Sequence, residues 1–165
     1  MQLGESFVGE GANAAHVNTV LGPREGPVGT AWATALATPS TGHAPFVAVL
    51  QPGIPAKPFT LFVNKAAIAS ERHGELTWGA AQAGVAAGVA AAVVQGTVVD
   101  LDQVLIAAVW VNPDADDADA VFANNEQATL RALVMGQQGT PSRSDVEQAL
   151  AAGPWNPYFR RRSTS

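Results

Sequence analysis

Apolar and polar residues alternate most clearly near the start of the chain. Residues 4–9 and 14–21 both show the two-residue period of a β-strand. In the second strand the odd-numbered residues share one face, and His16 and Asn18 project from the other face, two residues apart. The glycine-containing stretch 9–13 between them predicts a flexible turn. The pattern therefore predicts two strands, the second of which presents two neighbouring polar side chains.

Helical and strand-like segments alternate along the rest of the chain. Pro27 suits the first turn of a helix over Val28–Ala37. The segment Trp78–Gln95 has Ala, Val and Gly on every side, which predicts a helix buried on several faces or packed against other subunits. Within it, Gly84 and Gly88 allow close packing at a cost in helix stability. The other expected elements are strands at 46–51, 60–68 and 105–111, an acidic connector at 114–119, a helix at about 120–135 and a short helix at 144–151.

The order of these elements, β-β-α-β-β-α-β-α, predicts an α/β fold, a mixed α+β sandwich with helices on one face of the sheet. A length of 165 residues suits one domain of ordinary size. We expect residues 1–140 to form this domain and residues 141–165 to form a C-terminal extension. In that extension, residues 154–159 are either docked on a neighbour or mobile, and we favour docking.

Composition narrows the classes of partner and site. A net charge of −5 with no basic run in the body of the chain disfavours nucleic acid. The one basic cluster, Arg160–Arg162, is expected to be a solvated tail. The absence of cysteine excludes disulfides and thiolate chemistry. Met1–Ser6 lacks the features of a signal peptide, and Trp78–Val94 is short and Ala/Gly-rich for a membrane span, so we expect a cytoplasmic protein without a membrane partner.

Three histidines are candidates for acid–base chemistry, and their contexts differ. His43 and His73 stand in polar loops, which is typical of surface histidines. His16 stands in an alternating strand beside a glycine-rich turn, where position alone favours a hydrogen-bonded, half-buried residue over a catalytic one. No second histidine or acidic ligand has a recognisable spacing, so no metal site is expected.

Two further polar residues interrupt apolar segments. Lys65 lies within the expected strand 60–68, where an unpaired buried charge would be costly. Either its aliphatic stem covers the sheet while its ammonium reaches water, or the ammonium belongs to a functional site. Gln82 is the long polar side chain of an otherwise apolar helix and needs a partner, either backbone or ligand. Neither a nucleophile elbow nor a phosphate or dinucleotide loop is present. The residues thus yield four candidates: His16, Asn18, Lys65 and Gln82.

Further motifs accompany these candidates, at residues 8–11, 15–17, 22–24, 55–58, 64–65 and 79–86. In the order and spacing of these stretches the chain resembles the formaldehyde-activating enzyme family, over about residues 4–135. The resemblance implies a fold like the second domain of a small-subunit ribosomal protein, assembled as a homopentamer. It implies condensation of formaldehyde with the reduced pterin tetrahydromethanopterin, a co-substrate, to methylene-tetrahydromethanopterin and water in one-carbon metabolism, without a metal.

The resemblance also assigns site residues. The family's general acid falls on His16, and the site is shared between neighbouring subunits. The pterin-contacting positions fall on Asn18, Val47, Lys65, Ala67 and Gln82.

Two departures from the family pattern leave more than one function open. Asn18 replaces an acidic residue and cannot act as a carboxylate base. Ala67 replaces a threonine, and one lost ligand hydrogen bond costs about 0.5–1.5 kcal/mol. Three functions are therefore compatible with the sequence: an active formaldehyde-activating enzyme, a non-catalytic protein that binds a pterin or formaldehyde adduct, and a divergent paralogue that uses another pterin.

Overall fold

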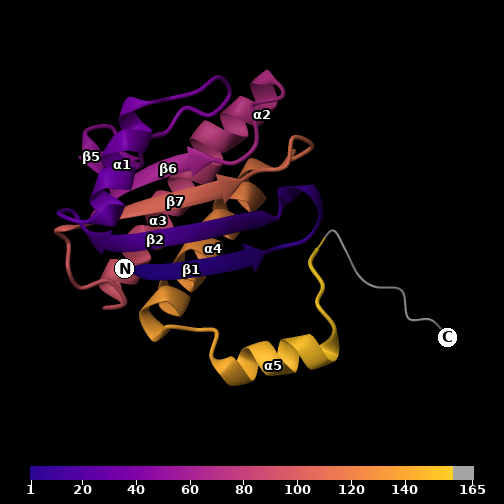
Figure 1. Cartoon of the computed structure of the whole chain (residues 1–165). Coiled ribbons are helices and arrows are strands. Elements are labelled where there is room, and N and C mark those ends of the chain that lie inside the picture. Colours follow the sequence, from indigo (N-terminus) through magenta and orange to yellow (C-terminus); the bar gives the residue numbers. More distant parts are fainter. Residues whose placement is uncertain (158–165) are drawn as a thin grey trace.

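The centre of the protein is a five-stranded mixed sheet, shown in Figure 1 as a computed structural model that describes residues 1–157. Strands β6 and β7 run parallel to each other, and the other pairs of neighbouring strands in this sheet are antiparallel. This arrangement confirms the expected mixed sheet. The strands lie in the order β1 (Gln2–Val8), β2 (Ala15–Pro23), β7 (Gln103–Trp110), β6 (Phe59–Asn64) and β3 (Phe46–Val47).

The first two strands form a hairpin, and its turn needs glycine. Gly9 and Gly11 have φ values of 85° and 64°, in the left-handed region where a side chain is strained. The short 3-10 helix η1 (Gly11–Asn13) completes the turn into β2. The alternating segments at 4–9 and 14–21 are thus confirmed as strands, each displaced by one or two residues at its ends.

Two long helices cover one face of this sheet, as predicted (Figure 1). Helix α4 (Ala118–Gln138) packs against β1 and β2, and helix α3 (Gln82–Val94) packs against α4 and β6. The packing is close: a Cβ added to Gly4 in β1 would stand 1.8 Å from the carbonyl oxygen of Ala132 in α4. The helix backbone therefore rests almost directly on the sheet at this point.

The two helices also meet each other through glycine. A Cβ at Gly84 would come within 2.4 Å of the carbonyl oxygen of Phe122, and one at Gly88 within 2.5 Å of that of Glu126. Backbone atoms cannot give way as flexible side-chain ends can, so both positions require glycine. This confirms the close packing predicted from their spacing.

The helix that contains α3 begins seven residues earlier than its apolar segment indicated. Ser70 accepts a hydrogen bond from the N–H of His73 (3.1 Å) and so caps α2 (Glu71–Glu75), which continues through the π-helical turn η2 (Leu76–Ala81) into α3. Within residues 1–157, this combined helix 71–94 is the one long and apolar enough to cross a membrane, with a mean hydropathy of 1.4. Half of its apolar window is buried inside the protein.

Two expected strands differ from the structure. The segment 46–51 is not one strand, because Ala48 donates to Thr60 (2.8 Å) and accepts from Ala56 (2.9 Å), which divides it into β3 and β4 (Val49–Gln51). Strand β4 pairs with β5 (Ile54–Pro55) in a separate two-stranded sheet. The strand expected at 60–68 ends at Asn64, whose side-chain amide donates to the carbonyl of Ala66 (2.8 Å) and turns the chain.

The remaining helices match their expected places. Helix α1 (Pro27–Ala37) begins at the proline and contacts β2 and β7. Helix α4 begins within the acidic connector, because Asp117 caps it by accepting from the N–H groups of Asp119 and Ala120.

Beyond α4 the chain forms the expected short helix, α5 (Arg143–Ala152), which has no buried residue and stands apart from the sheet in Figure 1. The chain then returns toward the hairpin, where Trp155 and Pro157 line a pocket of about 620 Å³ beside Phe7 and the β1–β2 turn. The expectations for Tyr158, Phe159 and the cluster 160–162 concern residues outside the described part of the chain.

Candidate active site

The face of the sheet opposite α3 and α4 carries His16 and Asn18. On β2, these two side chains and that of Val20 are half-buried, whereas the odd-numbered residues between them are buried. The register places Glu5 opposite Asn18 on β1, and Phe7 opposite His16. Residues that are opposite in the register share a face. We call this side of the sheet the open face; its other members are Leu3 on β1, Ile106, Ala108 and Trp110 on β7, and Leu61 and Val63 on β6.

His16 contacts a carboxylate and an aromatic ring from the neighbouring strand. Its Nε2 lies 2.9 Å from Oε1 of Glu5, and its side chain is 34% exposed. The ring of Phe7 lies beside the imidazole, with 5.9 Å between the centroids and 44° between the planes. The imidazole is therefore held on two sides while one part of it still reaches solvent.

Lys65 reaches the same site from the end of β6. Its backbone N–H donates to the carbonyl of Val109 (2.7 Å), and its ammonium donates to Oδ1 of Asn18. Burial of the ammonium lowers the pKa of Lys65 below its usual value, and the nearby negative charge of Glu5 partly opposes this decrease. Lys65 is an exposed residue, so its ammonium contacts Asn18 while it also reaches solvent.

Val47 and Ala67 lie outside these contacts, and β6 and β7 separate β3, which carries Val47, from β2. Val47 pairs with Leu61, and Leu61 pairs with Ile106, so Val47 extends a row of apolar residues on the open face. Ala67 is an exposed residue of the loop that follows β6, next to the turn at Gly42. Ala67 therefore belongs to the loop that carries Lys65, whereas Val47 lies on the edge strand of the sheet.

Gln82 lies elsewhere in the chain. It is 7% exposed, and its amide bonds both backbone groups of Val49: Nε2 donates to the carbonyl (3.0 Å), and Oε1 accepts from the N–H (3.4 Å). The partner that this buried amide needs is therefore backbone. A single chain brings together His16, Asn18 and Lys65, but Gln82 joins α3 to β4 instead.

The prediction that His73 is a surface histidine is wrong. His73 is 1% exposed; its Nδ1 accepts from the N–H of Ala69 (3.1 Å), and its Nε2 donates to the carbonyl of Val111 (3.1 Å). The polar residues around it form the first turn of α2, which faces the end of β7, rather than a loop. His43 is half-buried, and its Nδ1 bonds the carbonyl of Asn64 (2.9 Å).

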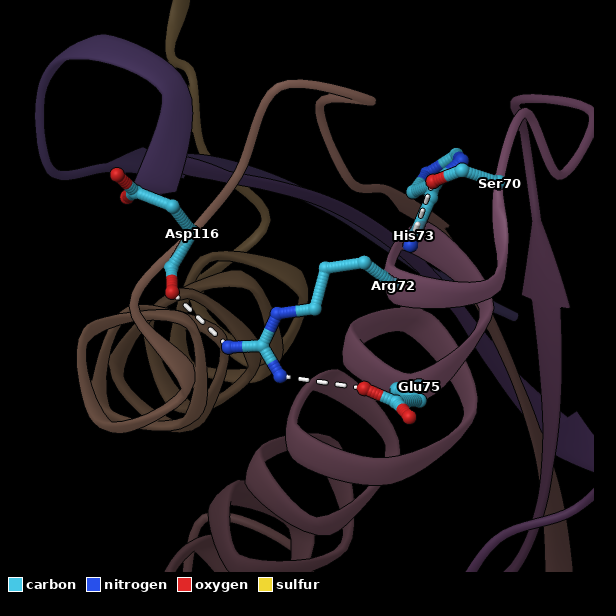
Figure 2. Close-up of polar contacts among 5 residues, drawn as sticks. All are labelled: Ser70, Arg72, His73, Glu75 and Asp116. Carbon is cyan, nitrogen blue, oxygen red and sulfur yellow. Dashed lines mark hydrogen bonds and ion pairs between the residues drawn. The ribbon is translucent and has the colours of Figure 1, made fainter.

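Figure 2 shows how α2 is attached at this point. Arg72 donates to the carbonyl of Asp116 (2.9 Å) and to the carboxylate of Glu75 (3.2 Å), while His73 is turned away from this pair, toward Ser70. The loop 65–70 that carries Lys65 is thus tied through α2 both to β7 and to the connector before α4.

Glu5 was missed by the sequence reasoning. It belongs to an alternating strand and resembles any solvated strand residue, because an alternation pattern places a side chain on a face without identifying its neighbours on the next strand. Only the β1–β2 register brings it to His16. Within residues 1–157, no group of three or more His, Asp or Glu side chains is arranged to hold a metal ion.

Comparisons with known proteins identify the family of this chain. A family model described as formaldehyde-activating enzyme matches residues 3–153. A protein of Methanosarcina barkeri named 5,6,7,8-tetrahydromethanopterin hydro-lyase is 40% identical over 152 residues, covering 90% of this chain and 84% of the relative. The chain belongs to the formaldehyde-activating enzyme family. The resemblance predicted from the sequence motifs is therefore confirmed.

Other members of the formaldehyde-activating enzyme family are longer. A protein of Methanosarcina barkeri named bifunctional enzyme Fae/Hps is 38% identical over 149 residues. One of the same name from Methanococcoides burtonii is 38% identical over 153 residues. This chain spans 38% of the length of each, so it corresponds to one part of those proteins.

Proposed function

We propose that this protein condenses formaldehyde with tetrahydromethanopterin to give methylene-tetrahydromethanopterin and water, with His16 as the general acid. The main support is the half-buried His16 on the sheet face opposite α3 and α4, beside Asn18 and Lys65, in a chain that matches its family over residues 3–153. The relative named as a hydro-lyase of this pterin, of which the chain covers 84%, supports the same substrate.

The chemistry requires one positioned proton donor. A pterin amine adds to the formaldehyde carbon and gives a carbinolamine, whose hydroxide is a poor leaving group. Protonation by the imidazolium of His16 lets it depart as water. The resulting iminium is attacked by the second pterin amine, and the proton released there restores the imidazolium. Because the uncatalysed condensation is itself possible, positioning and this proton transfer are sufficient.

The polar cluster also suits recognition of the pterin. The Asn18 amide and the Lys65 ammonium both offer hydrogen-bond donors. Ala67 adds an apolar side chain in the loop that carries Lys65. Asn18 is already engaged by Lys65, so in this protein the pair binds the pterin as a unit. Losing the family's carboxylate at Asn18 weakens this binding without removing the proton donor.

We further propose that the active enzyme is a cytoplasmic homopentamer with sites between subunits. Gln82 does not reach His16 within one chain, so a site that contains both draws them from two copies. The surface beside Gln82 supports such a contact, because Leu50 and Ile54, next to its partner Val49, are 45% and 52% exposed. Native mass spectrometry tests the assembly, and a monomer would contradict it.

The decisive experiment measures the rate at which methylene-tetrahydromethanopterin forms with purified wild type, with His16→Ala and, as a matched control, with His43→Ala. We expect His16→Ala to lose about 100-fold or more in rate, as is typical when a general acid is removed. His43 bonds Asn64 outside the cluster, so the rate of His43→Ala should stay within about threefold of the wild-type rate. A His16→Ala protein as fast as wild type would disprove the acid role.

The same assay separates the other two functions. Calorimetric binding of tetrahydromethanopterin without any rate enhancement by wild type would establish a binding protein. Faster turnover with tetrahydrofolate than with tetrahydromethanopterin would establish a paralogue that uses another pterin.

A further inference from the structure

We infer that Glu5 is a positioning residue for His16 that fixes which ring nitrogen faces the substrates. This inference rests on the proposed function of the site. Oε1 of Glu5 lies 2.9 Å from Nε2 of His16, within hydrogen-bond distance. An ionised carboxylate can only accept, so the hydrogen of this bond is on Nε2.

The consequence concerns Nδ1. In the neutral ring, the bond to Glu5 keeps the proton on Nε2 and leaves the lone pair on Nδ1. In the imidazolium, Nε2 keeps its proton and Nδ1 gains one. The proton that His16 gives to the carbinolamine hydroxyl and later recovers is therefore the proton on Nδ1. Glu5 itself neither touches the substrate nor changes its protonation state.

The hairpin explains why a glutamate can do this. Glu5 lies opposite Asn18, two residues along β2 from His16, so its contact with the imidazole is a diagonal one. Diagonal neighbours on paired strands stand roughly 7–8 Å apart and are reached only by long side chains. Aspartate, one methylene shorter, would not reach. Phe7, directly opposite His16, limits the ring from the other side.

The charges of the cluster agree with this role. The carboxylate of Glu5 also acts on the ammonium of Lys65, whose pKa it raises against the effect of burial. Residue 18 is an asparagine, so the carboxylate among Glu5, His16, Asn18 and Lys65 is that of Glu5. It therefore balances the positive charge of Lys65 while it orients His16.

The direct test is the tautomer of His16, read by NMR from nitrogen–proton couplings in protein labelled with ¹⁵N-histidine. In the neutral form of wild type we expect the Nε2–H tautomer to dominate. In Glu5→Gln we expect a mixture, because the amide can either accept from or donate to Nε2. His73 is an internal reference, since its bonds to Ala69 and Val111 fix the Nε2–H tautomer independently of Glu5.

The matched control is Glu10→Gln, which removes a carboxylate from the exposed turn of the same hairpin. It should leave the His16 tautomer unchanged. An Nδ1–H tautomer in wild type, or a His16 signal in Glu5→Gln identical to that of wild type, would overturn the inference.

Kinetics provide the second readout. We expect Glu5→Gln and Glu5→Asp each to lower kcat about tenfold or more, with KM changed less than about threefold, because the proton transfer and not pterin binding is affected. Glu10→Gln should match wild type. A Glu5→Gln enzyme with wild-type kcat would refute the positioning role. Full activity of His16→Ala would instead contradict the proposed function. The tautomer measurement does not depend on that result.

Discussion

The two faces of β2 show how one strand meets two different requirements. Its odd-numbered residues pack beneath the helices: Ala15 and Val17 are fully buried, and Thr19 and Leu21 nearly so. The residues between them on the open face, among them His16 and Asn18, stay half-buried and make polar contacts. Because the side-chain period is two, the buried face can fix the strand while the open face remains available for chemistry.

The two faces also differ in how they approach their neighbours. On the helix side, contact is made by backbone against backbone, through Gly4 in the sheet and Gly84 and Gly88 in α3. On the open face, contact is made by the ends of long side chains, those of Glu5 and Lys65. The first kind of contact tolerates little change in volume, and the second depends on both the length and the charge of the side chain.

The largest effect is expected on the helix side. Gly84→Leu places a side chain against the carbonyl of Phe122 and should lower the free energy of unfolding by about 3 kcal/mol or more, since backbone cannot move aside. The matched control is Gly79→Leu, in the preceding turn of the same helix, where a Cβ meets nothing within 4 Å. Urea unfolding of both variants measures the difference, and equal stabilities would contradict the close packing.

A second prediction concerns His73, which ties the loop that carries Lys65 to the end of β7. His73→Gln should keep the bond to Val111 and lose the one from Ala69, and His73→Leu should lose both. Each buried backbone group left unpaired costs about 1–3 kcal/mol, so thermal unfolding should place His73→Leu below His73→Gln and both below wild type. If His73→Leu is as stable as wild type, the loop is not held by this ring.

A third prediction compares two valines, Val17 and Val20, on opposite faces of β2. Val17→Thr puts a hydroxyl in the buried layer and should destabilise the protein by about 1–3 kcal/mol. Val20→Thr puts the same hydroxyl on the half-buried open face, where the cost should stay below about 0.5 kcal/mol. Denaturant melts of the two variants check this, and a reversal of the order would mean that the open face is the better-packed side.

The smallest effect concerns the charge of Lys65. Because burial lowers its pKa, the ammonium loses its proton at a lower pH than that of an exposed lysine, and pterin affinity should fall severalfold as the pH rises through that pKa. Glu5→Gln removes the charge that opposes this decrease and should move the fall in affinity to lower pH. Calorimetric titrations across alkaline pH test the shift, and Lys65→Met should show no such pH dependence.

Local patterns were sufficient for much of the fold. The alternation in residues 14–21 correctly placed His16 and Asn18 on one side of a strand, and the spacing of Gly84 and Gly88 correctly indicated close helix packing. Local patterns failed where pairing partners decide the outcome. The hydrogen bonds of Ala48 to Thr60 and Ala56 divide an apolar run that looks like one strand, and the Ser70 cap turns an apparent polar loop into a helix.

By itself, the sequence determined the identity of each candidate residue and the face of the strand on which His16 and Asn18 lie, because the alternation has a period of two residues. It also determined the family, through motifs spread along the chain. Only the tertiary structure decided which candidates meet. The β1–β2 register brought Glu5 to His16, and the turn after Asn64 brought Lys65 to Asn18, because such contacts join residues distant in the chain through strand pairing, which no local pattern specifies.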